Sequence, residues 1–390
     1  MRKIELVWAI ILSVATAGCV GGNKAPANEL ITVDVNASYP TKELTLQSFM
    51  EVEYIPLETT DEFITRGSVK AIGKSMLLVT NQGTNGDIFI YTREGKALRK
   101  VNRLGQSGEE YSQITFITLD EDNNEMFITD YPGRKVIVYD LMGNFRRSFS
   151  FSDTSYYNFI ANYDGDNLIC YKGYSPTMET EESYHLLISK KDGSITRKIQ
   201  IPFEKTQTPV WTKEGATITP GFSRTIPTQA VWTLLRGSSD TIYNYLPDQT
   251  MLPIIARTPS IHSMEPQVFL YPTAMTDRYY FMRVLTKEFD LEKMKGFSTR
   301  ELMYDKQEKA IFEYTLYNDD FVDKREVSWP SENSNSSIAA FWPLQAPNLV
   351  EAYEEGKLKG KLKEVASELD EESNPVIMLV KYRKEETENI

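Results

Sequence analysis

The chain has 390 residues, of which 41% are hydrophobic and 25% charged, so it can bury a sizeable globular core. Its formal net charge is −12 at pH 7, which excludes a protein whose main task is to bind nucleic-acid phosphates, because that task requires a basic surface. The 22 tyrosines and 18 phenylalanines favour β-strands.

Residues 1–18 have the pattern of a bacterial signal peptide. A short basic start precedes an apolar run over 6–14, which is far shorter than the ~20 residues that a membrane-spanning helix needs. Small residues then lead directly to Cys19 and resemble the lipobox of bacterial lipoproteins, although Thr16 stands where leucine is usual. We expect Cys19 to be lipidated, the alternative being an ordinary signal peptide beside an accidental cysteine.

Residues 19–30 are small and polar, and they are expected to form a flexible tether between the lipid and the folded domain. The second cysteine of the chain, Cys170, lies in the apolar run Asn-Leu-Ile-Cys-Tyr. This setting predicts a buried core residue rather than a reactive thiol. With Cys19 lipidated, an intramolecular disulfide is impossible, and the domain must be held together by its core.

An internal repeat is the most informative feature of the middle of the chain. An apolar strand, a turn with a glycine and a second strand recur in three stretches, residues 88–97, 136–145 and 186–195. Their turn glycines, Gly95, Gly143 and Gly193, lie 48 and 50 residues apart. A period near 50 with several short strands in each unit is the signature of a β-propeller.

The strands within one unit can be placed from the polar turns between the apolar runs. The second unit is predicted to contain four antiparallel strands, at residues 114–119, 126–129, 136–140 and 145–151. A fourth unit keeps a strand at 240–245 without the glycine turn. In the fifth unit, an insertion over 289–304 precedes a strand at 310–317.

Both ends of the repeat region carry additional elements. Residues 348–369 have helical periodicity interrupted by two glycines, so we expect a broken helix followed by a final strand at 374–383. Strands are also predicted at 31–35 and 50–56, before the first full repeat. Pairing strands from both termini in the last blade would close the ring and remove its exposed edges.

Four short motifs occur in an order typical of one family: Ile55–Thr59, Leu104–Tyr111, Asp240–Tyr243 and Asn374–Val376. The chain resembles the six-bladed β-propeller lipoproteins of the Bacteroidetes, which are related loosely to NHL- and TolB-like propellers. It departs from them at Ser107-Gly108, where members often carry Gly-Pro. The resemblance implies an all-β, six-bladed propeller of four-stranded antiparallel blades over 31–385 and a place in the cell envelope, at the periplasmic or surface face of the outer membrane. It implies little about the ligand.

Signatures of catalysis and of bound cofactors are absent from the sequence. The chain has two histidines, His185 and His262, too few for a histidine metal cluster, and neither a Gly-x-Ser-x-Gly elbow nor a nucleotide-binding loop. Residues 120–125 (Asp-Glu-Asp-Asn-Asn-Glu) resemble a Ca²⁺ loop but lack its glycine and its final glutamate, so a solvated turn is expected. We expect no catalytic residue, no metal ligand and no cofactor.

The loops that join inner strands and blades are expected to share one face, which we take as the ligand face. They span residues 81–87, 104–113, 130–135, 172–184, 212–228 and 236–240. Their aromatic and arginine side chains suit a carbohydrate, peptide or protein partner. The candidate ligand-binding residues are Tyr111, Tyr131, Arg134, Tyr174, Trp211, Arg224 and Arg236.

Loop 104–111 also has a structural interpretation, in which Glu110 accepts hydrogen bonds from backbone N–H groups and Tyr111 packs at the junction of two blades. For the whole chain, two functions remain open. One is a lipid-anchored binding or scaffold module that contacts the membrane only through its anchor and binds no nucleic acid. The alternative is a metal-dependent, lactonase-like hydrolase, which needs several carboxylates converging on the central tunnel.

Overall fold

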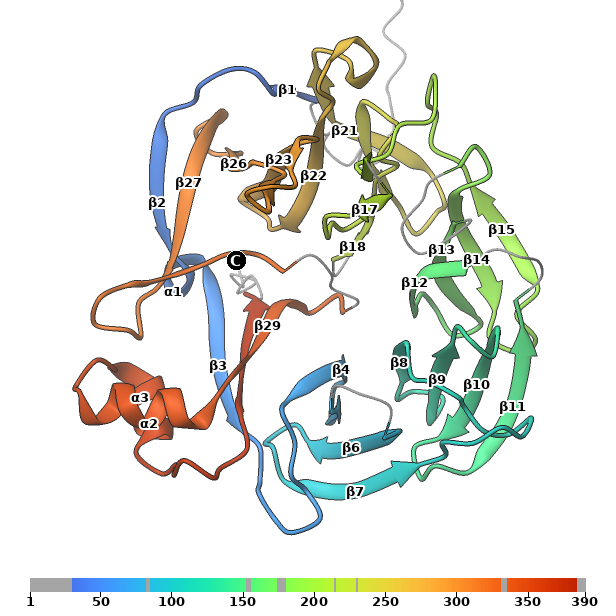
Figure 1. Ribbon diagram of the computed structural model, residues 1–390, viewed down its shortest axis with the longest axis vertical. Helices are drawn as coiled ribbons and strands as arrows, with labels where there is room; N and C mark the ends of the chain where they lie inside the picture. The colour runs from blue at the N-terminus through green and yellow to red at the C-terminus, as the bar shows by residue number, and fades with distance from the viewer. Residues whose placement is uncertain are drawn as a thin grey trace, which may run out of the picture.

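The fold is a ring of six β-sheets around a central axis (Figure 1). The computed structural model describes residues 30–81, 85–151, 156–173, 180–213, 215–228, 231–330 and 335–383. Each sheet is one blade, with its first strand nearest the axis and later strands farther out. The expectation of an all-β, six-bladed propeller is confirmed.

Blades 1 to 3 have four antiparallel strands each, in sequence order. Blade 1 contains β4 (Ser68–Ile72), β5 (Met76–Thr80), β6 (Asp87–Thr92) and β7 (Ala97–Asn102). Blade 2 contains β8 (Phe116–Asp120), β9 (Glu125–Asp130), β10 (Lys135–Asp140) and β11 (Phe145–Ser150). Blade 3 contains β12 (Tyr156–Asn162), β13 (Asn167–Gly173), β14 (Tyr184–Ser189) and β15 (Ile195–Ile199). The four strands expected in the second unit are therefore found within two residues of their predicted ends.

Blades 4 to 6 combine strands from both ends of the chain. Blade 4 contains β18 (Thr225–Pro227), β19 (Trp232–Leu234), β20 (Thr241–Tyr245), β21 (Met251–Thr258) and β1 (Ile31–Asp34). Blade 5 contains β22 (Val268–Met275), β23 (Tyr279–Thr286), β26 (Thr299–Asp305), β27 (Ala310–Asn318), β2 (Thr41–Thr45) and β28 (Arg325–Val327). Blade 6 contains β29 (Ile338–Leu344), β30 (Val376–Tyr382) and β3 (Met50–Pro56).

The ring closes in blade 6, where β3 pairs antiparallel with β30 from Met50↔Tyr382 to Pro56↔Val376. This confirms that strands from both termini share one blade. The two preceding N-terminal strands lie elsewhere: β1 runs parallel to β21 of blade 4, and β2 runs parallel to β27 of blade 5. The N-terminal segment thus lines the outer edge of three consecutive blades before the first complete repeat begins.

The hydrophobic core lies between the blades. Middle strands such as β9 and β10 are buried on both faces, because each sheet packs against a neighbour on either side, and their sequences are accordingly continuous apolar runs. The outer strand β11 instead alternates between more buried and exposed residues. Cys170 is fully buried between blades 2 and 3, as expected, and burial raises the pKa of its thiol.

The repeated outer turn requires a left-handed backbone in every blade from 1 to 5. Gly95 has φ +85° there, and a Cβ at this position would collide with the carbonyl oxygen of Pro56. The turns of blades 4 and 5 place Gln249 (φ 69°) and Lys309 (φ 50°) in the same kind of position. The turn geometry therefore continues where the glycine repeat in the sequence ends.

Helices are few and lie at the periphery. α1 (Leu46–Phe49) joins β2 to β3, the 3₁₀ helix η1 spans Ile261–Ser263, and α2 (Ala346–Glu354) and α3 (Gly360–Ala366) lie outside blade 6 (Figure 1). Gly356, with φ 71°, ends α2 and produces the expected break. Among the described residues, no helix is long and apolar enough to span a membrane.

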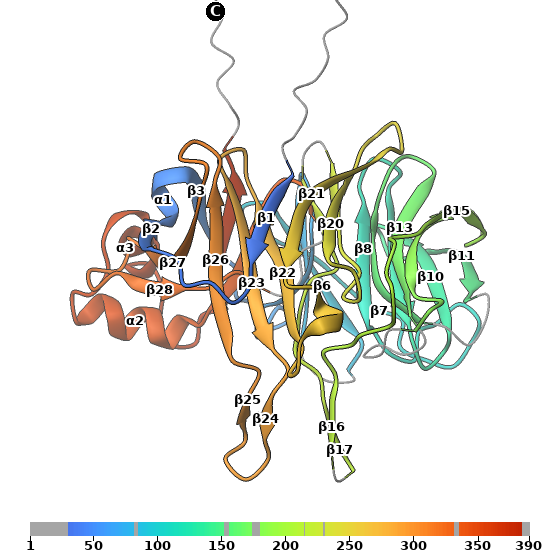
Figure 2. The same ribbon diagram turned by 90° about the horizontal axis from the view of Figure 1, so that it is seen from above.

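The two ends of the propeller differ in what they carry (Figure 2). The first strand, β1, begins and the last strand, β30, ends at the same face, which we call the termini face. Two hairpins project from the opposite face, which we call the arm face. These arms are β16 (Trp211–Lys213) with β17 (Ala216–Ile218), and β24 (Phe289–Asp290) with β25 (Lys295–Gly296). The second arm accounts for the first part of the insertion expected over 289–304, whereas residues 299–304 belong to β26 of blade 5.

Candidate functional site

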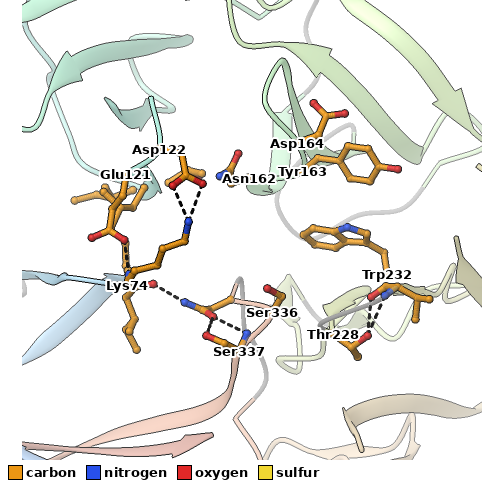
Figure 3. Close-up of a pocket in the computed structure, with 18 of the residues that line it drawn as sticks. Lys74, Glu121, Asp122, Asn162, Tyr163, Asp164, Thr228, Trp232, Ser336 and Ser337 are labelled. Carbon is orange, nitrogen blue, oxygen red and sulfur yellow. Dashed lines mark hydrogen bonds and ion pairs between the residues drawn. The ribbon is translucent and has the colours of Figure 1, made fainter. Parts of the chain in front are cut away.

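A cavity of about 600 Å³, the axial pocket, opens where the inner strands of several blades end. Its lining comes from the turns after β4, β8 and β12, from blade 4 and from the segment that leads into β29 (Figure 3). Ser337 lies next to the start of β29, which pairs with the end of β30, so this pocket belongs to the termini face. Five of the six blades therefore contribute residues to one cavity on the axis.

One wall of the axial pocket is charged. Lys74 Nζ lies 2.6 Å from Asp122 Oδ1, joining the first turn of blade 1 to that of blade 2 (Figure 3). The carboxylate of Asp122 raises the pKa of Lys74. Both side chains remain about three-quarters exposed, 77% and 74%, so this ion pair contributes little stability and its members stay accessible to a ligand. Glu121 beside them is fixed in place by the backbone N–H (2.9 Å) and the hydroxyl (2.7 Å) of Ser75.

The opposite wall is aromatic. Tyr163 lies with its ring centroid 6.0 Å from that of Trp232 and 6.2 Å from that of Tyr245, with interplanar angles of 35° and 36°. Burial raises the pKa of Tyr163 to about 12, so its hydroxyl stays protonated at neutral pH. Tyr163 and Trp232 are only partly buried and both line the cavity, toward which Trp232 points its indole ring (Figure 3).

Polar side chains complete the rim between these walls. Asn162 Oδ1 is buried and accepts no hydrogen bond from any described residue. Asp164 is held by the backbone N–H groups of Asp166 (2.9 Å) and Asn167 (2.7 Å). On the blade 6 side, the hydroxyl of Ser337 donates to Asn335 at 2.8 Å. These contacts fix most of the rim before any ligand arrives.

Beneath the rim, a buried ion pair joins blades 2 and 3. Lys190 Nζ lies 2.5 Å from Asp120 Oδ2, with the side chains only 6% and 2% exposed, and it also donates to the carbonyl oxygen of Asp164. Burial alone would raise the pKa of Asp120, but hydrogen bonds from Lys190 and Asn123 outweigh it and hold that pKa below its usual value. Lys190 thus ties together the two turns that carry Asp122 and Asp164 into the pocket.

Residues 120–125 form the expected hairpin turn, in which residues 122–124 are exposed. Asp120 is buried in the ion pair with Lys190, and Glu121 and Asp122 line the axial pocket. The turn is stabilised from within the ring and not by water alone. Nowhere in the part of the chain that the structure describes do three or more histidine, cysteine or acidic side chains come together in a way that could hold a metal ion.

The described parts of the loops predicted to share one face do so, because they follow strands that end at the arm face, opposite the axial pocket. Tyr111 is fully buried; its hydroxyl donates to Gly86 O at 2.6 Å and accepts from the N–H of Arg103 at 2.9 Å. Arg236 is also buried and donates to backbone carbonyls, including that of Ser183 at 2.6 Å. Neither side chain offers a ligand an exposed surface.

The other candidates occupy more open positions. Tyr131 packs among aromatic rings, 5.2 Å from that of Tyr156, and Arg134 lies 6.0 Å from the same ring. Arg224 stacks on Phe222 at 4.1 Å. Trp211 begins the first arm and contacts Phe289 of the second at 5.4 Å, beside a further cavity of about 600 Å³. Tyr174 and Cys19 lie outside the described residues.

The structural interpretation of loop 104–111 agrees with its contacts. Glu110 accepts from the backbone N–H of Ser107 at 2.9 Å, and hydrogen bonds from Ser107 lower the pKa of Glu110. Tyr111 fills the junction between blades 1 and 2 and meets the ring of Tyr139 edge-on at 6.2 Å. The motif that carries much of the family resemblance therefore has a packing role.

His185 is fully buried and lies 2.9 Å from Thr225 Oγ1. Burial lowers its pKa to about 3, so its imidazole is neutral at physiological pH. Because its side chain has no access to solvent, the position suits a core residue of a strand, as expected from the sequence.

The axial pocket itself was not predicted. Its charged residues sit in short turns of blades 1 to 3, each of which by itself looks like an ordinary polar hairpin, whereas Trp232 and Tyr245 come from strands of blade 4. The available signal was positional: Gly73-Lys74 and Glu121-Asp122 lie 48 residues apart, at matching points of the repeat. Equivalent turns of a propeller meet at one end of the axis, so such residues are expected to converge.

Comparison with known proteins agrees with the geometry. A family model, DUF5128, described as a 6-bladed beta-propeller, matches residues 22–337. No curated protein matches the chain. A solved structure from Bacteroides fragilis, of a protein whose given name describes it as exported, is 14% identical with a TM-score of 0.58 and covers 88% of this chain and 100% of its own.

Two other solved structures are more distant. A member of the DUF4221 family from Bacteroides vulgatus is 10% identical with a TM-score of 0.46, and covers 85% of this chain and 97% of its own. A virginiamycin B lyase from Staphylococcus aureus is 11% identical with a TM-score of 0.36, and covers 75% of this chain and 93% of its own. At these identities the likeness concerns the fold alone.

Proposed function

Because the chain belongs to the DUF5128 family of 6-bladed β-propellers, we propose that it is a binding module of the bacterial cell envelope whose ligand occupies the axial pocket. In this proposal the protein is exported and is held at the outer membrane by a lipid on Cys19, and the propeller binds without catalysing a reaction.

The axial pocket is the observation that carries this proposal. Its volume of about 600 Å³ lies within the range of ~300–1,000 Å³ that is common for small-molecule sites. Aromatic surface on one wall and fixed polar groups on the other are the two components that such sites combine. No specific observation favours the metal-dependent hydrolase, since the described residues bring no set of metal donors together.

The cleft between the arms is a second candidate for the ligand position, because Trp211 and Phe289 line it. It is open and mixed in charge, with Lys287 and Lys295 facing Glu265 and other acidic residues. The two sites lie at opposite faces of the propeller, so substitutions at one leave the other intact. This separation makes the choice between them testable.

Replacing Cys19 by alanine is expected to move the protein from the membrane pellet to the soluble fraction. Without a thiol there is no acylation, and the apolar run over 6–14 is too short to anchor the chain. Fractionation with fatty-acid labelling measures the effect, and Cys170→Ala is the control because that thiol is buried in the propeller. A Cys19→Ala protein that still incorporates the label would contradict the anchor.

Trp232→Ala and Trp211→Ala decide which cavity binds. Screening the purified propeller by thermal shift against oligosaccharides and short peptides is expected to give at least one stabilising compound. Titration calorimetry with that compound should show at least a tenfold loss of affinity for Trp232→Ala, equivalent to ~1.4 kcal/mol, and no change for Trp211→Ala.

The opposite pattern would move the binding site to the arm face and reject the axial pocket. Both variants remove a partly buried tryptophan from a short strand, so each serves as the stability control of the other. Unchanged affinity in both variants would place the ligand outside either cavity and also reject the proposal.

A further inference from the structure

Resting on the proposed function, we infer that the occupant of the axial pocket is a carbohydrate without acidic groups, bound with a sugar ring against Trp232. Three features of the pocket favour such a ligand: the difference between its two walls, the hydrogen-bonding capacity of its rim and its balance of charges. Each of these features narrows the chemistry of the ligand.

The aromatic wall calls for a flat apolar surface on the ligand. Trp232 points its indole ring toward the cavity as an aromatic platform, and the ring of Tyr163 lies beside it at an inclination of 35° (Figure 3). A pyranose ring has a face of C–H groups that can cover such a platform, while its hydroxyls project from the edge. Aromatic side chains with one polar end suit ligands of this mixed character.

The rim calls for a ligand with many hydroxyl groups. Asn162 Oδ1 is buried at the edge of the cavity and lacks a donor among the described residues, so a ligand hydroxyl can supply the missing hydrogen bond. Thr228 and Ser337 already donate their hydroxyls to Val231 O and Asn335 Oδ1, but each hydroxyl oxygen can still accept a hydrogen bond from a ligand hydroxyl. A purely apolar ligand would bury the remaining acceptor capacity of these oxygens without supplying a donor, at a cost in affinity.

The charges of the pocket act against acidic ligands. Three carboxylates, those of Glu121, Asp122 and Asp164, line it together with a single ammonium group, Lys74, which is already paired with Asp122. A uronic acid placed here would meet like charges and would have to break the Lys74–Asp122 pair. Like-charge contacts of this kind reject ligands that otherwise fit. Neutral and amino sugars carry no negative charge, so these carboxylates do not repel them.

A glycan array with neutral, amino, N-acetylated and uronic-acid oligosaccharides, together with a tripeptide library, tests the inference on the intact propeller. We expect the strongest binders to be neutral or amino sugars. For the best of them, Trp232→Ala should lower affinity at least tenfold, whereas Trp232→Phe should stay within about threefold because it keeps a ring surface.

Asp122→Asn tests the role of charge. It removes one carboxylate and releases Lys74, so uronic-acid oligosaccharides should gain at least fivefold in affinity while neutral ones change little. Glu364→Gln is the matched control, because it removes a carboxylate from a similarly exposed lysine pair, Lys361–Glu364, on α3 outside the ring. This control should leave every affinity unchanged.

The outcomes distinguish a failure of the carbohydrate inference from a failure of the proposed binding function. The inference is overturned if peptides bind and no sugar does, or if uronic acids bind as tightly as neutral sugars. If Trp232→Ala abolishes that binding, the axial pocket remains the binding site. If a probe binds with the same affinity to Trp232→Ala, or if no compound of the array and the library binds, both the inference and the proposed function are rejected.

Discussion

Lys190→Met is expected to lower the free energy of unfolding by about 3–5 kcal/mol, the usual cost of leaving one partner of a buried ion pair without the other. Asp120 would remain only 2% exposed and would keep the hydrogen bonds of Asn123 but lose the ammonium group. The carbonyl oxygen of Asp164 would lose its bond from Lys190 as well. Chemical denaturation monitored by tryptophan fluorescence measures the change.

Two further variants make that result specific. Lys191→Met, at the exposed neighbouring position in the same turn, should shift stability by less than ~0.5 kcal/mol. Adding Asp120→Asn to Lys190→Met removes the uncompensated charge and should recover part of the loss. If Lys190→Met is as stable as Lys191→Met, the ion pair does not hold blades 2 and 3 together.

Deleting residues 374–383 should leave no folded monomer. The deletion removes β30, whose residues Val376 to Val380 are fully buried or nearly so between β29 and β3. Burying each large apolar side chain contributes about 1.5–3 kcal/mol, so the loss is comparable with the ~5–15 kcal/mol that stabilises a whole domain. The deletion also exposes the edges of two strands, which favours aggregation.

Size-exclusion chromatography and thermal unfolding measure this effect. A chain lacking only residues 384–390 is the control, since the strands of blade 6 end at Tyr382. It should remain monomeric with an unchanged melting temperature. A monomeric, equally stable 374–383 deletion would mean that β3 and β30 do not close the ring.

The fold was largely predictable because the period of the repeat and the apolar strands are local properties. Gly95, Gly143 and Gly193 mark three equivalent turns, and the strands around them follow from alternating apolar and polar runs. Blades 4 and 5 were harder to place, since Gln249 and Lys309 adopt the same positive φ without the residue that usually signals it. The partner of β1 was also missed, because β1 adds a parallel fifth strand to the already complete blade 4 and no closure of the ring requires it.

The candidate site was less predictable than the fold for a physical reason. Sequence reasoning favoured aromatic and arginine residues in long loops, yet the long loops extend from the arm face, and Tyr111 and Arg236 proved to be buried. The axial pocket is assembled from short turns of blades 1 to 3, strands of blade 4 and the segment before β29, and its character depends on which of them face one another across the axis. That relation follows from the ring geometry and from no single segment.

The N-terminal strands along blades 4 to 6 have a consequence for how the chain reaches its folded state. Ile31 pairs with Ile255, Thr41 with Glu313 and Met50 with Tyr382, so the earliest synthesised strands find their partners among the last. Contacts of such high sequence separation slow folding, because a long loop must close before they form. Blades 4 and 5 therefore stay incomplete until residues 258 and 318 have been synthesised, and blade 6 stays incomplete until nearly the whole polypeptide has emerged. For the export that we propose, in which a chain crosses a membrane unfolded, this delay would provide time.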